Sequence, residues 1–145
     1  MPIIVQSKIL LVTNDASEES HTVHILSKYH FANLVIRLQT AKEASKYFAA
    51  FQSSEPNSEE DFPEMIILSF GMGVTESHNL VLQSREGSLK HIPLIVVAGN
   101  REEEEAFRKL DLPRTFCITK PIGFFKILEA MQKLGMYWIA LRSAP

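Results

Sequence analysis

The stretch that decides the fold is Met65–Leu68 (MIIL), an apolar run that ends in Ser69-Phe70-Gly71-Met72-Gly73. A short, continuous apolar run bounded by glycines is typical of a strand that is covered on both faces of a sheet. Four further apolar runs have strand length: Ile9–Val12, Leu34–Leu38, Leu94–Val97 and Phe116–Ile118. The first and third of these are also continuous rather than alternating, so we expect a largely buried sheet.

Segments with helical spacing alternate with these runs: Ser17–Tyr29, Thr40–Phe51, Leu80–Arg85, Glu102–Leu110 and Gly123–Leu134. Ser17 is a candidate N-cap, and Thr40 with Glu43 fits a capping box. Strands that alternate with helices predict a parallel sheet with right-handed crossovers. We therefore expect one α/β domain over residues 1–145, with a doubly wound five-stranded parallel sheet in the flavodoxin-like order 2-1-3-4-5. A helical extension is expected at about residues 135–143.

Composition excludes several classes of function. The formal net charge is −2, and the acidic run Glu102–Glu105 argues against a phosphate-binding face there, so no nucleic-acid partner is expected. The single cysteine, Cys117, cannot form an internal disulfide, which favours the cytoplasm. The apolar stretches are too short for a membrane span, and the N-terminus lacks a signal-peptide pattern.

Ligands and chemistry in open α/β sheets lie at the carboxyl ends of the strands. The expected strand ends carry Thr13-Asn14, Ser69, Ala98-Gly99 and Thr119-Lys120-Pro121. These positions offer one lysine and no carboxylate, and Asp15 follows immediately after Asn14. The sequence therefore predicts a site with one fixed cation and almost no acid.

Four phrases, in this order, resemble the strand signatures of the receiver domain of bacterial two-component response regulators: Lys8–Val12, Pro63–Leu68, His91–Val97 and Ile118–Pro121. The resemblance covers nearly the whole chain. Cys117-Ile118-Thr119-Lys120-Pro121, with Tyr137-Trp138 after the last helix, is similar to the stand-alone receivers that partner bacterial phytochrome histidine kinases. The long loop before the third strand is also similar to that subgroup.

The resemblance implies a site that transfers a phosphoryl group from a kinase histidine to an aspartate, with Mg²⁺ held by two acids after the first strand. The nucleophile position is Ser69, and the metal-binding pair falls on Thr13 and Asn14. Mg²⁺ requires oxygen ligands, and a neutral serine needs a neighbouring base, which the sequence does not make evident. The expected site therefore has no bound metal and no cofactor.

Most of the remaining site positions also differ from the residues that the receiver resemblance implies. The fourth-strand hydroxyl position is Ala98, the aromatic switch position is Cys117, and Gly71 belongs to a looser loop after the third strand. Lys120 alone is retained. It is either a remnant phosphate contact or, as we expect in the absence of acid partners, a lysine bonded to neutral Ser69 and backbone carbonyls. A buried ammonium group without a carboxylate is costly, so we expect Lys120 to lean toward solvent or toward Asp15. Asp15 is itself most simply an acid at a helix N-terminus.

These positions together predict a pseudo-receiver that is not an enzyme and acts by protein–protein contact. Tyr137, Trp138 and Leu141 are the candidate interface residues because aromatic anchors are enriched at interfaces. The resemblance to the phytochrome-partner receivers implies that this region forms a symmetric homodimer. It also implies a histidine kinase or a phytochrome-like protein as a further partner. Two alternatives remain open: phosphotransfer through Ser69 or Asp15, and a small-ligand site in the crevice at the strand ends.

Overall fold

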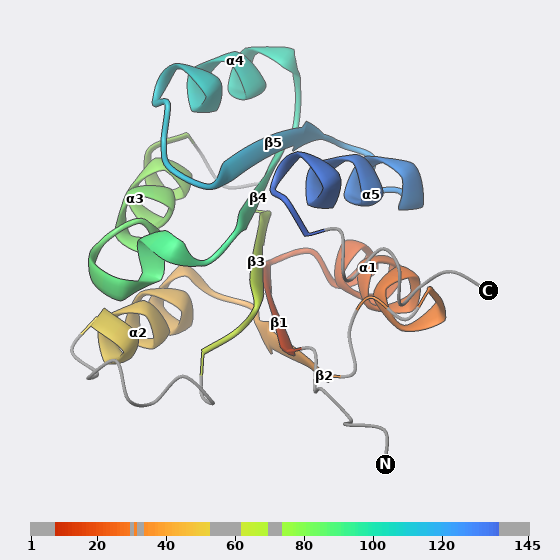
Figure 1. Ribbon diagram of the computed structural model, residues 1–145, viewed down its shortest axis with the longest axis horizontal. Coiled ribbons are helices and arrows are strands. Elements are labelled where there is room, and N and C mark those ends of the chain that lie inside the picture. Colours follow the sequence, from red (N-terminus) through yellow and green to blue (C-terminus); the bar gives the residue numbers. More distant parts are fainter. Residues whose placement is uncertain (1–7, 30, 32–33, 53–61, 70–73, 137–145) are drawn as a thin grey trace.

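The computed structural model describes residues 8–29, 31, 34–52, 62–69 and 74–136. Five parallel strands form one sheet in the order β2-β1-β3-β4-β5 (Figure 1). Their bounds are β1 (Lys8–Thr13), β2 (Leu34–Leu38), β3 (Met65–Ser69), β4 (Leu94–Ala98) and β5 (Thr115–Thr119). The predicted strand order is confirmed, and each predicted run differs from its strand by at most one residue at either end.

The helices cover both faces of the sheet, as the doubly wound arrangement requires (Figure 1). Their bounds are α1 (Ala16–Lys28), α2 (Ala41–Gln52), α3 (Val74–Ser84), α4 (Arg101–Lys109) and α5 (Phe124–Lys133), with a 3₁₀ helix η2 (Gly87–His91) before β4. The third helix begins six residues before the predicted Leu80. Polar residues after Val74 lack the apolar spacing that identifies a helix in sequence.

Two cores lie on opposite faces of the sheet because successive strand residues point to opposite sides. Ile9 and Leu11 of β1 belong to the core under α1 and α5, whereas Leu10 and Val12 belong to the core under α2, α3 and α4. All four side chains are fully buried. This double coverage explains why the central strands are continuous apolar runs.

The N-cap of helix α1 lies two residues earlier than the sequence pattern predicts. Asp15, not Ser17, is the N-cap, and its Oδ1 accepts the backbone N–H of Ser17 at 2.9 Å and of Glu18 at 3.1 Å. A carboxylate satisfies two orphan N–H groups of the first turn and also favours the helix dipole, so it outcompetes the serine two residues later. Thr40 accepts the N–H of Glu43 at 3.1 Å, as the predicted capping box requires.

Helix α5 ends in a Schellman motif. Gly135 has a positive φ of 78°, and its N–H donates to the carbonyl of Gln132. The N–H of Met136 donates to the carbonyl of Met131 at 2.8 Å. A left-handed glycine at this position ends the helix. The helical extension expected at about residues 135–143 falls almost wholly outside the described residues and stays a prediction. No helix in the described ranges has the length and apolarity to cross a membrane.

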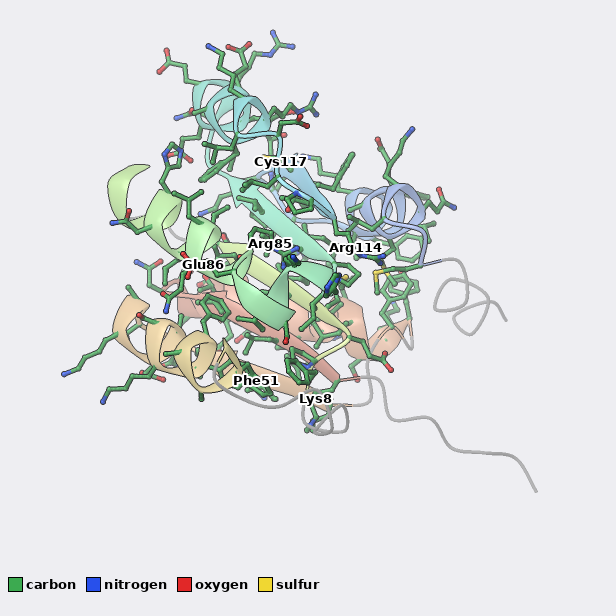
Figure 2. All side chains as sticks on the ribbon, turned by 60° about the vertical axis from the view of Figure 1, so that its left-hand side comes forward. Lys8, Phe51, Arg85, Glu86, Arg114 and Cys117 are labelled. Carbon is green, nitrogen blue, oxygen red and sulfur yellow. The ribbon has the colours of Figure 1, made fainter. Side chains whose placement is uncertain are left out.

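Arg85 joins the connection before β4 to the turn before β5. Its side chain is buried, and its Nε donates to the carbonyl of Ser84 at 3.1 Å. Its two terminal nitrogens donate to the carbonyl of Pro113 at 3.1 Å and to the carbonyl of Leu89 at 3.2 Å. Figure 2 shows Arg85 beside η2, with Arg114 close to it. Burial, and then the charge of Arg114, lowers the pKa of Arg85 to about 10. Backbone carbonyls therefore hold this guanidinium without a carboxylate from the described residues.

Replacing Arg85 with alanine should lower the free energy of unfolding by about 2–4 kcal/mol, because several buried carbonyls lose their donor at once. Chemical denaturation measures the change. The matched variant Arg37→Ala removes an exposed arginine from β2 and should change the free energy by less than about 0.5 kcal/mol. Equal effects of the two substitutions would contradict the role assigned to Arg85.

Candidate functional site

The register of the sheet brings the predicted site residues to one edge. Thr13 at the end of β1 lies opposite Ser69 at the end of β3, and Ala98 at the end of β4 lies opposite Thr119. The N–H of Lys120 continues this ladder by donating to the carbonyl of Ala98 at 2.9 Å. The strand ends β1, β3, β4 and β5 therefore meet where the sequence places the site.

Glu18 occupies the centre of this site. Its Oε2 lies 3.0 Å from the Nζ of Lys120, and its Oε1 accepts a hydrogen bond from the hydroxyl of Ser69 and one from Thr13 Oγ1 at 3.4 Å. The Glu18 side chain is 10% exposed and that of Lys120 is 29% exposed. The expectation that Lys120 lacks an acid partner and leans toward solvent or Asp15 is therefore wrong. The expectation that Ser69 has no basic neighbour is wrong too.

The cap of α1 explains how a residue on a helix reaches the strand ends. Asp15 holds the N–H groups of the first turn, so Glu18 is the third residue of the helix, on the turn that adjoins the end of β1. Side chains in a helix point back toward its N-terminus. Asp15 also donates its own N–H to Thr13 Oγ1 at 3.2 Å, which orients that hydroxyl. Asp15 is thus an acid at a helix N-terminus, as its simplest interpretation predicts, and it also provides the cap that the sequence pattern predicts for Ser17.

A second glutamate reaches the strand ends from α4. Glu103 accepts the N–H of Gly99 with its Oε2 at 2.6 Å, while Asn100 caps α4 by accepting the N–H of Glu103 at 2.9 Å. A Cβ added to Gly99 would lie 3.2 Å from that Glu103 oxygen, so glycine leaves room for this contact. Two side-chain carboxylates, from Glu18 and Glu103, therefore accept hydrogen bonds from donors at the strand ends.

The residues present do not fit the magnesium ion that the receiver resemblance implies. Mg²⁺ prefers a near-octahedral set of oxygen ligands that includes carboxylates. The two metal-acid positions hold Thr13 and Asn14, Asp15 caps α1, and Glu18 is paired with an ammonium group. Within the described ranges, no group of three or more His, Cys, Asp or Glu side chains could hold a metal ion.

Cys117 in β5 is buried, as a small apolar residue would be. Burial, and then the nearby carboxylate of Glu104, raises the pKa of its thiol to about 12. The thiol is therefore a poor nucleophile at neutral pH. The switch position of the resemblance thus holds a neutral side chain that packs in the core under α4.

Grooves follow β5, one of the two edge strands of the sheet. A pocket of about 140 Å³ lies between α4 and α5, and a second of about 260 Å³ lies between α4 and the start of β5. Both are lined by Phe116, Cys117 and Arg108. Lys126 of α5 donates to the carbonyl of Thr119 at 2.7 Å. This face of the domain is thus shaped by both neighbouring helices.

Four predicted site residues lie outside the described residues: Gly71, Tyr137, Trp138 and Leu141. Glu18 is the residue that sequence reasoning missed. The sequence signal that could have identified Glu18 is its position three residues after the capping Asp15. That position places an acid on the first turn of the helix that follows β1. An acid at that position is ordinarily explained by the helix dipole alone, and that explanation conceals its second role.

The fold resembles those of response regulators in solved structures. The bacteriophytochrome response regulator AtBRR is 25% identical, with a TM-score of 0.74 over 90% of this chain and 94% of its own. RtBRR, another bacteriophytochrome response regulator, is 24% identical, with the same TM-score over 90% and 79%. The phosphorylated cyanobacterial phytochrome response regulator RcpA is 18% identical, with a TM-score of 0.61 over 97% and 98%. No protein-family model and no curated protein matches the sequence.

The buried thiol should resist alkylation. At pH 8 we expect iodoacetamide to modify Cys117 in the folded protein about a thousandfold more slowly than in denaturant, because a pKa of about 12 leaves so little thiolate. Intact mass against time measures the rate. Since the chain has one cysteine, denatured protein is the matched control. Modification at the same rate in both states would contradict this account of the switch position.

Proposed function

We propose that this chain, which is a CheY-like receiver domain, is a pseudo-receiver of two-component signalling that acts through protein–protein contact without being phosphorylated. The observation that carries the proposal is the contact of Glu18 with Ser69 and Lys120. The hydroxyl and the ammonium group at the strand ends are satisfied by a carboxylate of the same chain. Among the described residues, a phosphoryl group would therefore find neither an acceptor nor a cation that is not already engaged.

The chemistry of Ser69 supports this proposal. Its side chain has no exposed surface, and its hydroxyl proton is directed to Glu18. A serine needs a general base to become a nucleophile. The base present is the carboxylate of Glu18, which is already ion-paired with Lys120. Asp15, the other alternative acceptor, is exposed, and its Oδ1 is engaged in capping α1.

The charge balance of the site supports it as well. Phosphoryl transfer depends on metal ions that neutralise the charge developing on the transferred group. With Thr13 and Asn14 at the metal-acid positions, Lys120 is the one cation that the site supplies among the described residues, and Glu18 already neutralises it. The site therefore lacks the positive charge that the reaction requires. In our proposal the chain is accordingly not an enzyme.

The alternative of a small-ligand site at the strand ends is less favoured for the same reason. Glu18 and Glu103 engage the Lys120 ammonium group, the Ser69 hydroxyl and the Gly99 N–H. A ligand would have to displace both glutamates before it could form polar contacts there. The two pockets that follow β5 are not lined by any of these three donors.

The partner surface that we propose is the groove along β5, and its occupant is a second copy of the chain. Charged residues of both signs line the groove: Glu104 and Arg108 from α4, and Lys126 and Glu129 from α5. A surface with paired opposite charges is complementary to itself across a twofold axis. Tyr137, Trp138 and Leu141 remain proposed interface residues on their sequence alone. The resemblance to phytochrome response regulators supports a histidine kinase or phytochrome-like protein as a further partner.

Incubation with acetyl phosphate and Mg²⁺ should add no phosphoryl group to the protein, and intact mass spectrometry checks this. An active receiver treated in parallel controls for the phosphodonor. The variant Ser69→Asp should also remain unmodified, because the acids that would hold Mg²⁺ are still missing at Thr13 and Asn14. A stoichiometric, acid-labile adduct on the wild type would contradict the proposed function.

The wild-type chain should be a dimer at high micromolar concentration, as measured by size-exclusion chromatography with light scattering. Glu129→Lys places a second cation near Lys126 in the groove and should raise the dissociation constant at least about tenfold. Gln132→Lys, on the same helix outside the groove, is the matched control and should leave dimerisation unchanged. A monomeric wild type, or equal effects of both variants, would rule out this interface.

A further inference from the structure

Glu18 lies in the environment that a bound oxyanion would need. Three donors from three strand ends converge on its carboxylate: the ammonium group of Lys120 after β5, the hydroxyl of Ser69 in β3 and the hydroxyl of Thr13 in β1. Ser69 and Thr13 are buried, so neither hydroxyl has an alternative partner in bulk water. One cation and two hydroxyl donors around a single anion form a complete oxyanion site.

We propose that Lys120, Ser69 and Thr13 form an oxyanion-binding site whose resident anion is the carboxylate of Glu18, held in cis. The site is thereby closed to free small oxyanions in the wild-type chain. Removal of the Glu18 charge opens it to a tetrahedral oxyanion such as inorganic phosphate. This inference rests on the proposed function, because it concerns the same site at the strand ends.

Tethering explains why Glu18 excludes a free ligand. The carboxylate belongs to a helix whose first turn is fixed by the Asp15 cap, so its effective concentration at Lys120 is in the millimolar range or higher. A free oxyanion has to exceed that concentration, or bind more strongly, before it displaces the side chain. It would also leave the Glu18 charge nearly buried and without its cation, which is unfavourable.

The same contact holds α1 against the segment that follows β5. Glu18 and His21 lie one turn apart on α1, and His21 Nε2 lies 3.1 Å from the carbonyl of Ile122 while Glu18 binds Lys120. Two consecutive residues of one helical face thus contact residues 120–122. The resident carboxylate therefore fixes the position of this segment, which leads into α5, without any external ligand.

The test compares Glu18→Gln with the wild type in titrations with inorganic phosphate. The glutamine keeps the shape of the side chain and removes its charge, which leaves Lys120 unpaired. We expect the variant to bind phosphate at least tenfold more tightly than the wild type, seen as a phosphate-dependent rise in Tm and in the hydrogen-exchange protection of residues 119–122. The wild type should show neither effect.

Glu102→Gln is the matched control because it removes the same charge from an exposed position in the first turn of α4. It should respond to phosphate as the wild type does. Glu18→Gln/Lys120→Met should lose the gained affinity, because the cation of the site is gone. Glu18→Ala, which removes the carboxylate altogether, is the second test if the glutamine variant fails to fold, and it should also gain affinity.

The inference is overturned if no folded Glu18 variant binds phosphate more tightly than the wild type, or if Glu102→Gln gains the same affinity. Its failure is distinguishable from that of the proposed function. A covalent phosphoryl adduct on the wild type contradicts the proposed function, whereas the reversible phosphate affinity of the Glu18 variants tests the resident anion.

Discussion

The interaction on which the rest of the site depends is the ion pair between Glu18 and Lys120. A partly buried lysine that follows β5 is costly to leave without a counter-charge. The positions at which the resemblance implies acids hold Thr13, Asn14 and Ser69 instead, so the counter-charge has to come from elsewhere. Helix α1 supplies it from its first turn. The neutral side chains at these strand ends and the Glu18–Lys120 contact are therefore consistent parts of one arrangement.

The fold was accessible from sequence because its signals are local and repeated. Continuous apolar runs such as Met65–Leu68 require coverage on both faces, and alternation of strands with helices leaves few topologies. The start of a helix is harder to predict than a strand. Asp15 and Ser17 both have side chains that can cap α1, and only the three-dimensional position of the first turn decides between them. The Schellman end of α5 at Gly135 depends on a backbone conformation that a glycine permits but does not require.

The site was predictable only in part. Sequence placed Thr13, Ser69, Ala98 and Lys120 at one edge because parallel strands end there together. It did not identify Glu18, because a glutamate in the first turn of a helix has a sufficient local explanation in the helix dipole. The contacts of Arg85 were missed for a similar reason, since they join two turns whose proximity depends on the tertiary fold. In both cases a charged side chain stabilises an arrangement that no local pattern encodes.

A double-mutant cycle between Glu18 and Lys120 tests the central claim most directly. The free energies of unfolding of the wild type, Glu18→Gln, Lys120→Met and the double variant give the coupling between the two side chains. A direct, mostly buried contact predicts a favourable coupling of about 1–3 kcal/mol. A coupling that is indistinguishable from zero would contradict the account, because Glu18 would then not be the anion that holds Lys120.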